Sequence, residues 1–394
     1  MRLERCGSRI EEQQSVKLVQ GVLLARRRHH AVLRVAAVLV LAAPGLLASS
    51  ARANATGAPR ASSPEPGVAV GLKTCTFVDH SRSVMNFTTT PASLLSSSRT
   101  LVTEIRYPAT YVTGAPSEQR GATPLASPSG YPMIVFAHGY DVTPDIFAPL
   151  LDAWVRAGFV VASPLFPDEK QSEVSAQHGA NTEEDLVNEP ADLAFVTRAL
   201  LLASNNTPSN CPVMRGLVSA SELALAGHSD GATAVAMLAF DHGLDPQGVN
   251  FATLRTGLHF SAVAIFTGAE NRAQSYAAEA SHPNLLVVHS RVDQCNPLSN
   301  DVTLYDTIHQ PNKWFLELQH AHHLPPFDGT DPVAFHVVAA TTVRFFRESL
   351  QGFTPTTNLV TYASQDPAVA RMYKGTLGPT FEPEPKLKPV CSRN

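Results

Sequence analysis

A serine between two glycines is the first feature of this 394-residue chain that suggests chemistry. The segment GHSDG at positions 227–231 follows the apolar run 223–226 and precedes a largely apolar stretch, 232–240. A strand, a sharp turn and a helix in that order hold a serine on a strained turn with its oxygen exposed, and glycines there avoid collisions with neighbouring backbone. We therefore predict that Ser229 is a nucleophile.

A serine nucleophile of this kind needs two backbone N–H groups that bind the negatively charged oxygen of the transition state. One is expected from Asp230, the residue after the serine, at the start of the following helix. The other is expected from Tyr140, because His138-Gly139-Tyr140 directly follows the apolar run 133–137. The Tyr140 ring could also form a wall of the acyl pocket.

A carboxylate that orients the catalytic base is expected at the carboxyl end of a later strand. Asp293 follows the apolar run 285–289 and is the preferred candidate, while Glu270, after the run 262–266, is the alternative. The carboxylate would hold the tautomer of the histidine and stabilise its protonated form without taking the proton itself.

Three histidines follow the apolar run 314–318, and any of them could be the base. We predict His323, with His322 second and His320 third. With His323, the serine, the acid and the histidine follow one another in the chain order of hydrolases whose serine lies on such a strand–turn–helix segment, the nucleophile elbow. His228 is held in the elbow and is a poor candidate. A surface loop or an adventitious metal site is the alternative for these histidines, but no further ligands at zinc-like spacing stand out, so we expect no metal.

The elements that position these residues follow from an alternation of strand and helix patterns. This alternation predicts an α/β domain with a mostly parallel sheet and helices on both faces. Only residues 269–281 could form a lid, so we expect a minimal lid and a site open to bulky or polymeric substrates. The predicted strands span 68–78, 100–107, 133–137, 159–162, 223–226, 262–266, 285–289 and 314–318, and the predicted helices span 146–157, 193–202, 232–240 and 337–350.

The N-terminal residues 1–53 have the features of a signal peptide: a run of arginines, an apolar stretch and a final Ala-Arg-Ala. A membrane anchor is the alternative, but the uninterrupted apolar run 35–43 is too short to span a bilayer. General and twin-arginine export both stay open. We expect a flexible linker over 54–68 and a single catalytic domain with a C-terminal tail over 69–394.

The content of charged residues and of cysteines limits which partners and which compartment we expect for this chain. Residues 1–53 contain nine of the 30 Lys and Arg and three of the 34 Asp and Glu, which leaves 21 basic and 31 acidic residues, a net charge of −10. Such an acidic protein is a poor ligand for nucleic acid or anionic lipid. The four cysteines beyond residue 53 suit two disulfides, in any of three pairings. We expect a secreted or periplasmic monomer with no membrane anchor after cleavage. These cysteines are Cys75, Cys211, Cys295 and Cys391.

The stretch from Val70 to Gly352 resembles the dienelactone hydrolase, chlorophyllase and platelet-activating-factor acetylhydrolase branch of the α/β-hydrolase superfamily, to which cutinase-like polyester hydrolases are related. The resemblance implies an α/β-hydrolase fold and ester hydrolysis through an acyl-enzyme, without a cofactor. The chain departs from many relatives in having His-Ala-His-His at 320–323 instead of Gly-Ala-Ser-His, and from cutinase-like enzymes in having Asp230 instead of Met. The matching motifs are DHSR at 79–82, EIRYPA at 104–109, AHGY at 137–140, AGHSDG at 226–231 and TVRFFRESL at 342–350.

The resemblance also assigns roles to positions of this sequence. Ser229, Asp293 and His323 would form the catalytic triad, and Tyr140 and Asp230 the oxyanion hole. The sequence thus predicts a secreted serine esterase that acts on small, lipid or polyester substrates. An amide or peptide hydrolase with the same triad and a catalytically silent binding protein of the same fold are the alternatives.

Overall fold

The computed structural model places the predicted signal peptide, the linker up to residue 67 and Glu270 outside the described residues, together with nearly all of the predicted lid. Residues 62–394 form one compact unit, and the description below concerns that unit. The structure describes residues 68–87, 89–111, 118–176, 182–205, 207, 209–268, 276, 283–383, 385 and 391.

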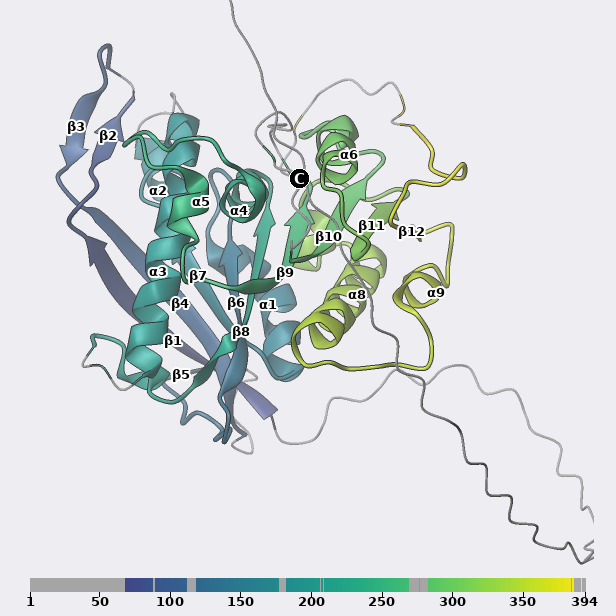
Figure 1. Ribbon diagram of the computed structural model, residues 1–394, viewed down its shortest axis with the longest axis horizontal. Helices are drawn as coiled ribbons and strands as arrows, with labels where there is room; N and C mark the ends of the chain where they lie inside the picture. The colour runs from purple at the N-terminus through teal and green to yellow at the C-terminus, as the bar shows by residue number, and fades with distance from the viewer. Residues whose placement is uncertain are drawn as a thin grey trace, which may run out of the picture. The chain divides into compact units, whose positions relative to one another are not determined.

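A large mixed sheet organises this unit (Figure 1). Its strands are β1 (Val68–Asp79), β4 (Arg99–Thr110), β5 (Glu118–Arg120), β6 (Tyr131–Ala137), β7 (Val160–Leu165), β8 (Val218–His228), β9 (Phe260–Phe266), β10 (Asn284–Ser290), β11 (Lys313–Leu318) and β12 (Ala370–Lys374). They lie in the order β12-β11-β10-β9-β8-β6-β7-β4-β1-β5. A separate hairpin pairs β2 (Val84–Asn86) with β3 (Ser93–Ser96).

The predicted mostly parallel sheet is present, and antiparallel strands near both edges make it a mixed sheet. From β7 across β6, β8, β9 and β10 to β11, every neighbouring pair is parallel. At one side β1 and β7 both run antiparallel to β4, and at the other β12 runs antiparallel to β11. Strand β12 lies in the segment expected to be a tail, where its five residues, ARMYK, carry too weak a pattern to predict a strand.

The helices cover both faces of the sheet, as expected. They are α1 (Ala148–Arg156), α2 (Gln171–Ala176), α3 (Glu189–Ser204), α4 (Asp230–Phe240), α5 (Phe251–Leu254), α6 (Leu298–Thr307), α7 (Pro325–Asp328), α8 (Pro332–Leu350) and α9 (Leu359–Ala363), with 3-10 turns η1 (Pro144–Phe147), η2 (Thr182–Asn188) and η3 (Pro212–Met214). Residues of α3, α4 and α6 belong to one hydrophobic core, and residues of α1 and α8 to the other.

The two cores explain why the central strands are apolar without interruption. Successive side chains of a strand point to opposite faces. Accordingly Val135 and Leu225 belong to the core under α3 and α4, whereas their chain neighbours Ile134 and Ala224 belong to the core under α1 and α8. A sheet covered on both faces requires apolar residues at every position.

Helix α8 begins five residues earlier than the predicted span 337–350. Pro332 occupies its first turn, where a missing N–H leaves no bond unmade. The Asp331 side chain accepts hydrogen bonds from the N–H groups of Val333 and Ala334 and so caps the helix. The prediction was wrong here because it relied on apolar spacing and overlooked this cap.

Both expected disulfides are present, and the structure selects one of the three pairings. Cys75 on β1 is bonded to Cys211, and Cys295 after β10 is bonded to Cys391. The first bond is buried between the sheet and the segment before η3, whereas Cys391 is exposed.

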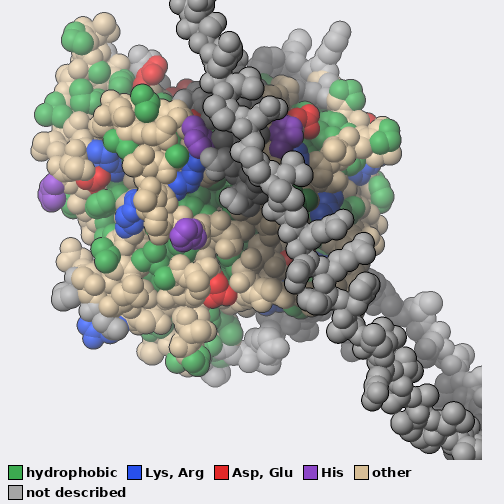
Figure 2. Space-filling model, in the orientation of Figure 1, with side chains coloured by type: hydrophobic (Ala, Val, Ile, Leu, Met, Phe, Trp, Pro, Cys, Tyr) green, Lys and Arg blue, Asp and Glu red, His purple; other side chains and the backbone are tan. Residues whose placement is uncertain are grey.

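Charged side chains do not gather in one place on the face shown in Figure 2. Acidic, basic and histidine side chains are scattered there among apolar and uncharged ones. Across the described part of the chain, no helix combines the length and the apolar character that crossing a membrane requires.

Candidate active site

Ser229 occupies a strained turn between β8 and α4. Its φ of 58° and ψ of −121° are a conformation that residues with a side chain rarely adopt. A Cβ added to Gly227 would lie 2.3 Å from the carbonyl oxygen of Gly231, and one added to Gly231 would lie 2.3 Å from that of His138. The backbone therefore needs glycine on both sides of the serine, as the GHSDG pattern predicts.

The loop after β6 lies directly against this turn. A Cβ on Gly139 would be 2.9 Å from Cβ of Ser229. His138 fixes the loop: its Nδ1 donates to the carbonyl of Gly139 at 2.8 Å, and its Nε2 accepts from the N–H of Phe166 at 3.1 Å. Burial lowers the pKa of His138 to about 4, so the ring is neutral and the loop that carries Tyr140 has one defined arrangement.

A pocket of about 250 Å³ opens beside Ser229. Tyr140 and Asp230, the predicted oxyanion-hole residues, line it together with Ser229 and His323. Four of the five predicted site residues therefore meet at one cavity. Its complete lining is Gly139, Tyr140, Val142, Glu183, His228, Ser229, Asp230, Cys295, Asn296, His323, Leu324 and Cys391.

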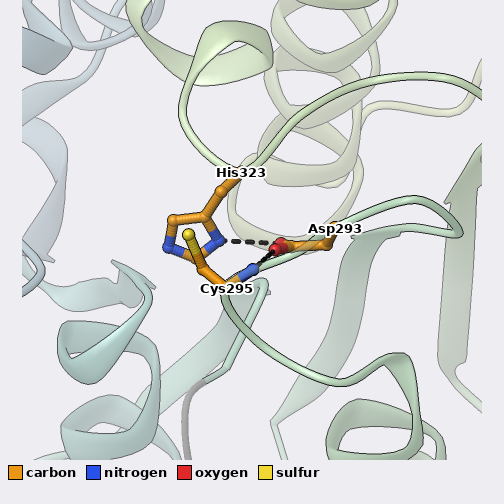
Figure 3. A group of neighbouring side chains, drawn as sticks. All are labelled: Asp293, Cys295 and His323. Atoms are coloured by element: carbon orange, nitrogen blue, oxygen red, sulfur yellow. Dashed lines mark hydrogen bonds and ion pairs between the residues drawn. The ribbon is translucent and has the colours of Figure 1, made fainter. Parts of the chain in front are cut away.

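The fifth, Asp293, lies behind this lining and bonds to His323 (Figure 3). The distance from Nδ1 of His323 to Oδ2 of Asp293 is 2.7 Å. The other carboxylate oxygen, Oδ1, accepts the N–H groups of Cys295 and Asn296 at 2.8 and 3.1 Å. Burial raises the pKa of Asp293, but the hydrogen bonds and charges of the histidines and the backbone N–H groups outweigh it, so the pKa lies below its ordinary value and the group is ionised at neutral pH.

The structure distinguishes the three candidate histidines by position. His320 and His322 are exposed on the loop after β11, whereas the His323 side chain is 14 % exposed and faces Asp293. Because Asp293 engages Nδ1 of His323, Nε2 is the ring nitrogen left to accept a proton. His228, whose pKa burial lowers to about 3, is neutral and bonds elsewhere.

The loop that carries His323 is tied to the sheet at two points. Nε2 of His228 donates to the carbonyl oxygen of His323 at 3.0 Å. The hydroxyl of Ser290, at the end of β10, donates to the carbonyl oxygen of Ala321 at 2.5 Å. The elbow and the acid strand therefore both fix the histidine loop, which a pattern of sequence letters does not reveal.

Asp293, Cys295 and His323 could also be considered as metal ligands, because their donor atoms lie within 4.8 Å of one another (Figure 3). The sulfur of Cys295 is bonded to Cys391 and cannot act as a thiolate. Nδ1 of His323 already donates to the carboxylate. The chemistry of these donors does not suit a metal ion.

A second histidine–aspartate pair lies beneath the site and was missed from the sequence. His289, the last but one residue of β10, places Nδ1 at 2.7 Å from Oδ2 of Asp301 in α6. Its Nε2 lies 3.2 Å from the backbone oxygen of Asn296. Burial lowers the pKa of His289, but the hydrogen bond and the charge of Asp301 raise it by more. The pKa therefore lies above its ordinary value.

Asn296 was also missed, although it contacts the predicted nucleophile. Its Nδ2 lies 3.3 Å from Oγ of Ser229 and 2.7 Å from the carbonyl oxygen of Thr267. Thr267 and Asp141, like Ser229, have positive φ, at 47° and 57°. The only sequence signal was the position of Asn296 three residues after Asp293, which does not by itself indicate a contact with the serine.

Two glutamates lie buried together near the elbow. Glu169 follows β7 and Glu189 begins α3, and both are fully buried. Burial raises the pKa of each well above its ordinary value, and the charge of Asp230 raises both further. The charge of Glu169 also raises the pKa of Glu189, whereas the hydrogen bond with Glu189 lowers that of Glu169. Ionisation of both glutamates is therefore unfavourable in the folded protein.

Comparison with known proteins adds the fold class. No family model matches the chain, and no curated protein matches it. The ferulic acid esterase from Streptomyces cinnamoneus has a similar structure, with a TM-score of 0.55 and 16 % identity, covering 75 % of this chain and 94 % of that one. This likeness shows that the two proteins share an α/β fold. Because 905 solved chains match, the fold alone does not define an activity.

Proposed function

We propose that the protein is a serine hydrolase of carboxylic esters. One observation carries the proposal: Ser229, on a strained elbow, lines the same pocket as His323, whose ring is hydrogen-bonded to the buried carboxylate of Asp293. A serine that lines a pocket, an oriented imidazole and an ionised acid are the parts that acyl transfer through a serine requires.

The reaction follows from these positions. Nε2 of His323 accepts the proton of the Ser229 hydroxyl while Oγ forms a bond to the ester carbonyl carbon. Backbone N–H groups of Tyr140 and Asp230 stabilise the oxyanion. The histidine then gives its proton to the leaving alkoxide as the carbon–oxygen bond breaks. Water repeats the cycle on the acyl-enzyme and releases the acid, without a cofactor.

The pocket indicates which part of the ester is enclosed. Its volume of about 250 Å³ lies just below the range of about 300–1,000 Å³ that holds a drug-sized ligand. We assign it to the acyl group of a small-molecule ester, with the alcohol portion outside. The α/β-hydrolase motifs support the dienelactone hydrolase-like branch, and the esterase structural neighbour supports the ester class.

The two disulfides bear on where the protein acts. Two disulfides suit an oxidising compartment, which supports export and removal of residues 1–53. We propose that the mature enzyme acts outside the cytoplasm without a membrane anchor, as a monomer.

The test uses p-nitrophenyl esters of rising acyl length, each paired with its anilide, and a soluble polyester. Ser229→Ala should lower kcat by about 10⁴- to 10⁶-fold and abolish fluorophosphonate labelling. Ser221→Ala, at an exposed serine on β8, the strand before Ser229, is the matched control and should retain both. Full activity of Ser229→Ala would exclude the proposal. Faster cleavage of the anilides than of the esters would favour an amidase. Absence of fluorophosphonate labelling of the wild type would favour a catalytically silent binding protein.

A further inference from the structure

The side chain of Asn296 joins the proposed nucleophile to the end of β9. Its Nδ2 lies 2.7 Å from the carbonyl oxygen of Thr267, which can only accept a hydrogen bond, so the nitrogen and not the oxygen of the amide must face it. The second hydrogen of the same NH₂ group is then directed at Oγ of Ser229, 3.3 Å away. The Ser229 hydroxyl thus receives a hydrogen bond from the side of β9.

The backbone of Asn296 is held by two charged groups. Its N–H donates to Oδ1 of Asp293, and its carbonyl oxygen accepts from Nε2 of His289. His289 also donates through Nδ1 to Oδ2 of Asp301, which in turn accepts the N–H of Gly268. Both nitrogens of His289 face acceptors, so the ring is a buried imidazolium clamped between a carboxylate and a carbonyl.

We propose that Asn296 is a catalytic residue that orients the Ser229 hydroxyl, and that His289 and Asp301 are positioning residues that act through Asn296. The inference rests on the proposed function. A serine hydroxyl has two acceptor sites and one hydrogen, which rotates freely unless a partner fixes it. With an acceptor site occupied by the amide of Asn296, the hydroxyl hydrogen is restricted to the remaining directions, which include that of His323.

The same amide favours the attack itself. As His323 removes the proton, negative charge builds on Oγ until the bond to the carbonyl carbon forms. A hydrogen bond to an oxygen that gains charge is stronger than one to a neutral hydroxyl, so Asn296 stabilises the transition state more than the resting enzyme. Its contribution therefore belongs to formation of the acyl-enzyme.

The first arm of the test replaces Asn296 by alanine in the full chain. We expect kcat for p-nitrophenyl acetate and the rate of fluorophosphonate labelling to fall together by about 10- to 100-fold, as for the loss of one charge-strengthened hydrogen bond. KM should change less than about threefold, because the amide acts on the serine and not on the bound ester. The matched control is Asn250→Ala, which removes another amide with two backbone hydrogen bonds, at the start of α5.

The second arm uses Asn296→Asp and its pH profile. The ionised carboxylate has no hydrogen to donate and its charge opposes the charge on Oγ, so this variant should be slower than Asn296→Ala at neutral pH. The ratio of its activity to that of the wild type should rise as the pH falls and the carboxyl regains a proton. A purely structural role would leave this ratio constant. The ionisable groups around the position are Asp293, His289, His323 and His228.

The third arm tests the positioning residues with a double-mutant cycle. Asp301→Asn should lower kcat about 5- to 10-fold in the wild type, as for one weakened hydrogen bond, and have no further effect in Asn296→Ala. Labelling of Asn296→Ala at the wild-type rate, a rise in KM alone, or additive effects of the two changes would overturn the inference. Failure of the proposed function would appear differently, as an unlabelled wild type or an active Ser229→Ala.

Discussion

Two histidine–aspartate pairs lie close together in this protein, and only one of them is placed to do chemistry. Both join Nδ1 of the histidine to Oδ2 of the aspartate at 2.7 Å. In the pair His323–Asp293 the histidine is 14 % exposed and lines the pocket, whereas in His289–Asp301 the side chains are 0 % and 2 % exposed.

The difference lies in what the second ring nitrogen meets. Nε2 of His289 donates to the carbonyl oxygen of Asn296, so its proton is committed to the fold. His323 is bonded to protein through Nδ1, and its backbone carbonyl, not its ring, accepts from His228. An acid beside a histidine therefore does not define a general base. A general base also needs a second ring nitrogen that is left to the substrate side, and this requirement supports the proposal of His323.

The largest expected loss of activity comes from replacing the carboxylate of one pair, and the same change in the other pair should cost much less. Asp293→Asn should lower kcat by about 10³- to 10⁴-fold, because an amide stabilises the wrong tautomer of His323. Asp301→Asn should lower it only about tenfold, because that acid acts on the nucleophile indirectly. Steady-state kinetics of both variants on one ester check the ranking, and equal losses would mean that the pairs share one role.

The next effect concerns stability and its dependence on pH. His289→Gln should lower the free energy of unfolding by about 3–5 kcal/mol, because it leaves Asp301 as a buried, poorly partnered charge. The pKa of His289 is raised in the fold, so its contribution is complete below the ordinary value of 6.5 and is lost as the pH rises through the raised pKa.

Urea unfolding of the wild type and His289→Gln at pH 6 and pH 9 measures this dependence. The deficit of the variant should be larger at pH 6. His323→Gln, at the more exposed pair, should lose less stability than His289→Gln. A deficit that is equal at both pH values would show that His289 is not charged in the folded protein.

A third experiment compares the disulfide beside the His323–Asp293 pair with the one that lies away from the pocket. Cys391→Ser and Cys211→Ser should each lower the free energy of unfolding by about 2–4 kcal/mol. Only Cys391→Ser should change KM, because Cys295 and Cys391 line the pocket and the Cys295 N–H bonds to Asp293, whereas Cys211 is buried away from it. Thermal melts and kinetics on esters of two acyl lengths check both, and an unchanged KM would remove Cys391 from the substrate site.

The smallest expected effect is on stability and comes from the buried pair of glutamates, Glu169 and Glu189. Burial raises the pKa of Glu169 and of Glu189, so ionising them in the fold is unfavourable and stability falls as the pH rises above the ordinary value of 4.5. Glu169→Gln should therefore raise stability by about 1 kcal/mol, or about 2 °C in Tm, at pH 8 and hardly at all at pH 5. Melting curves at both pH values test this, and a loss of Tm at pH 8 would contradict it.

The parts of the site that depend on one segment could be predicted from the sequence. The elbow around Ser229 follows from a strand, two glycines and a helix, and Asp293 from its place at the end of an apolar strand. The central strands could be read in the same way, because burial on both faces leaves continuous apolar runs. The antiparallel edges, by contrast, carry short or mixed patterns such as β12 (Ala370–Lys374).

The parts that depend on several segments could not be predicted. That the ring of His323 meets Asp293 depends on the fold, in which His228 and Ser290 bond to the histidine loop. The choice of His323 as the base stays a prediction. Asn296 meets Ser229 only because the chain turns after β10 and α6 brings Asp301 back under His289. No spacing rule in the sequence expresses a contact between residues 67 positions apart.

Among the residues that the structure describes, three that are not glycine have positive φ, and each lines the pocket or is next to a residue that lines or contacts it: Asp141, Ser229 and Thr267. Such backbone conformations cost about 1–3 kcal/mol each, and glycine relieves most of that cost. Selection in the laboratory for heat tolerance alone would therefore favour glycine at these positions, and the candidate active site would change before the sheet. A lineage that must stay active would instead gain heat tolerance elsewhere, so the residues that resist this pressure would mark the working part of the molecule.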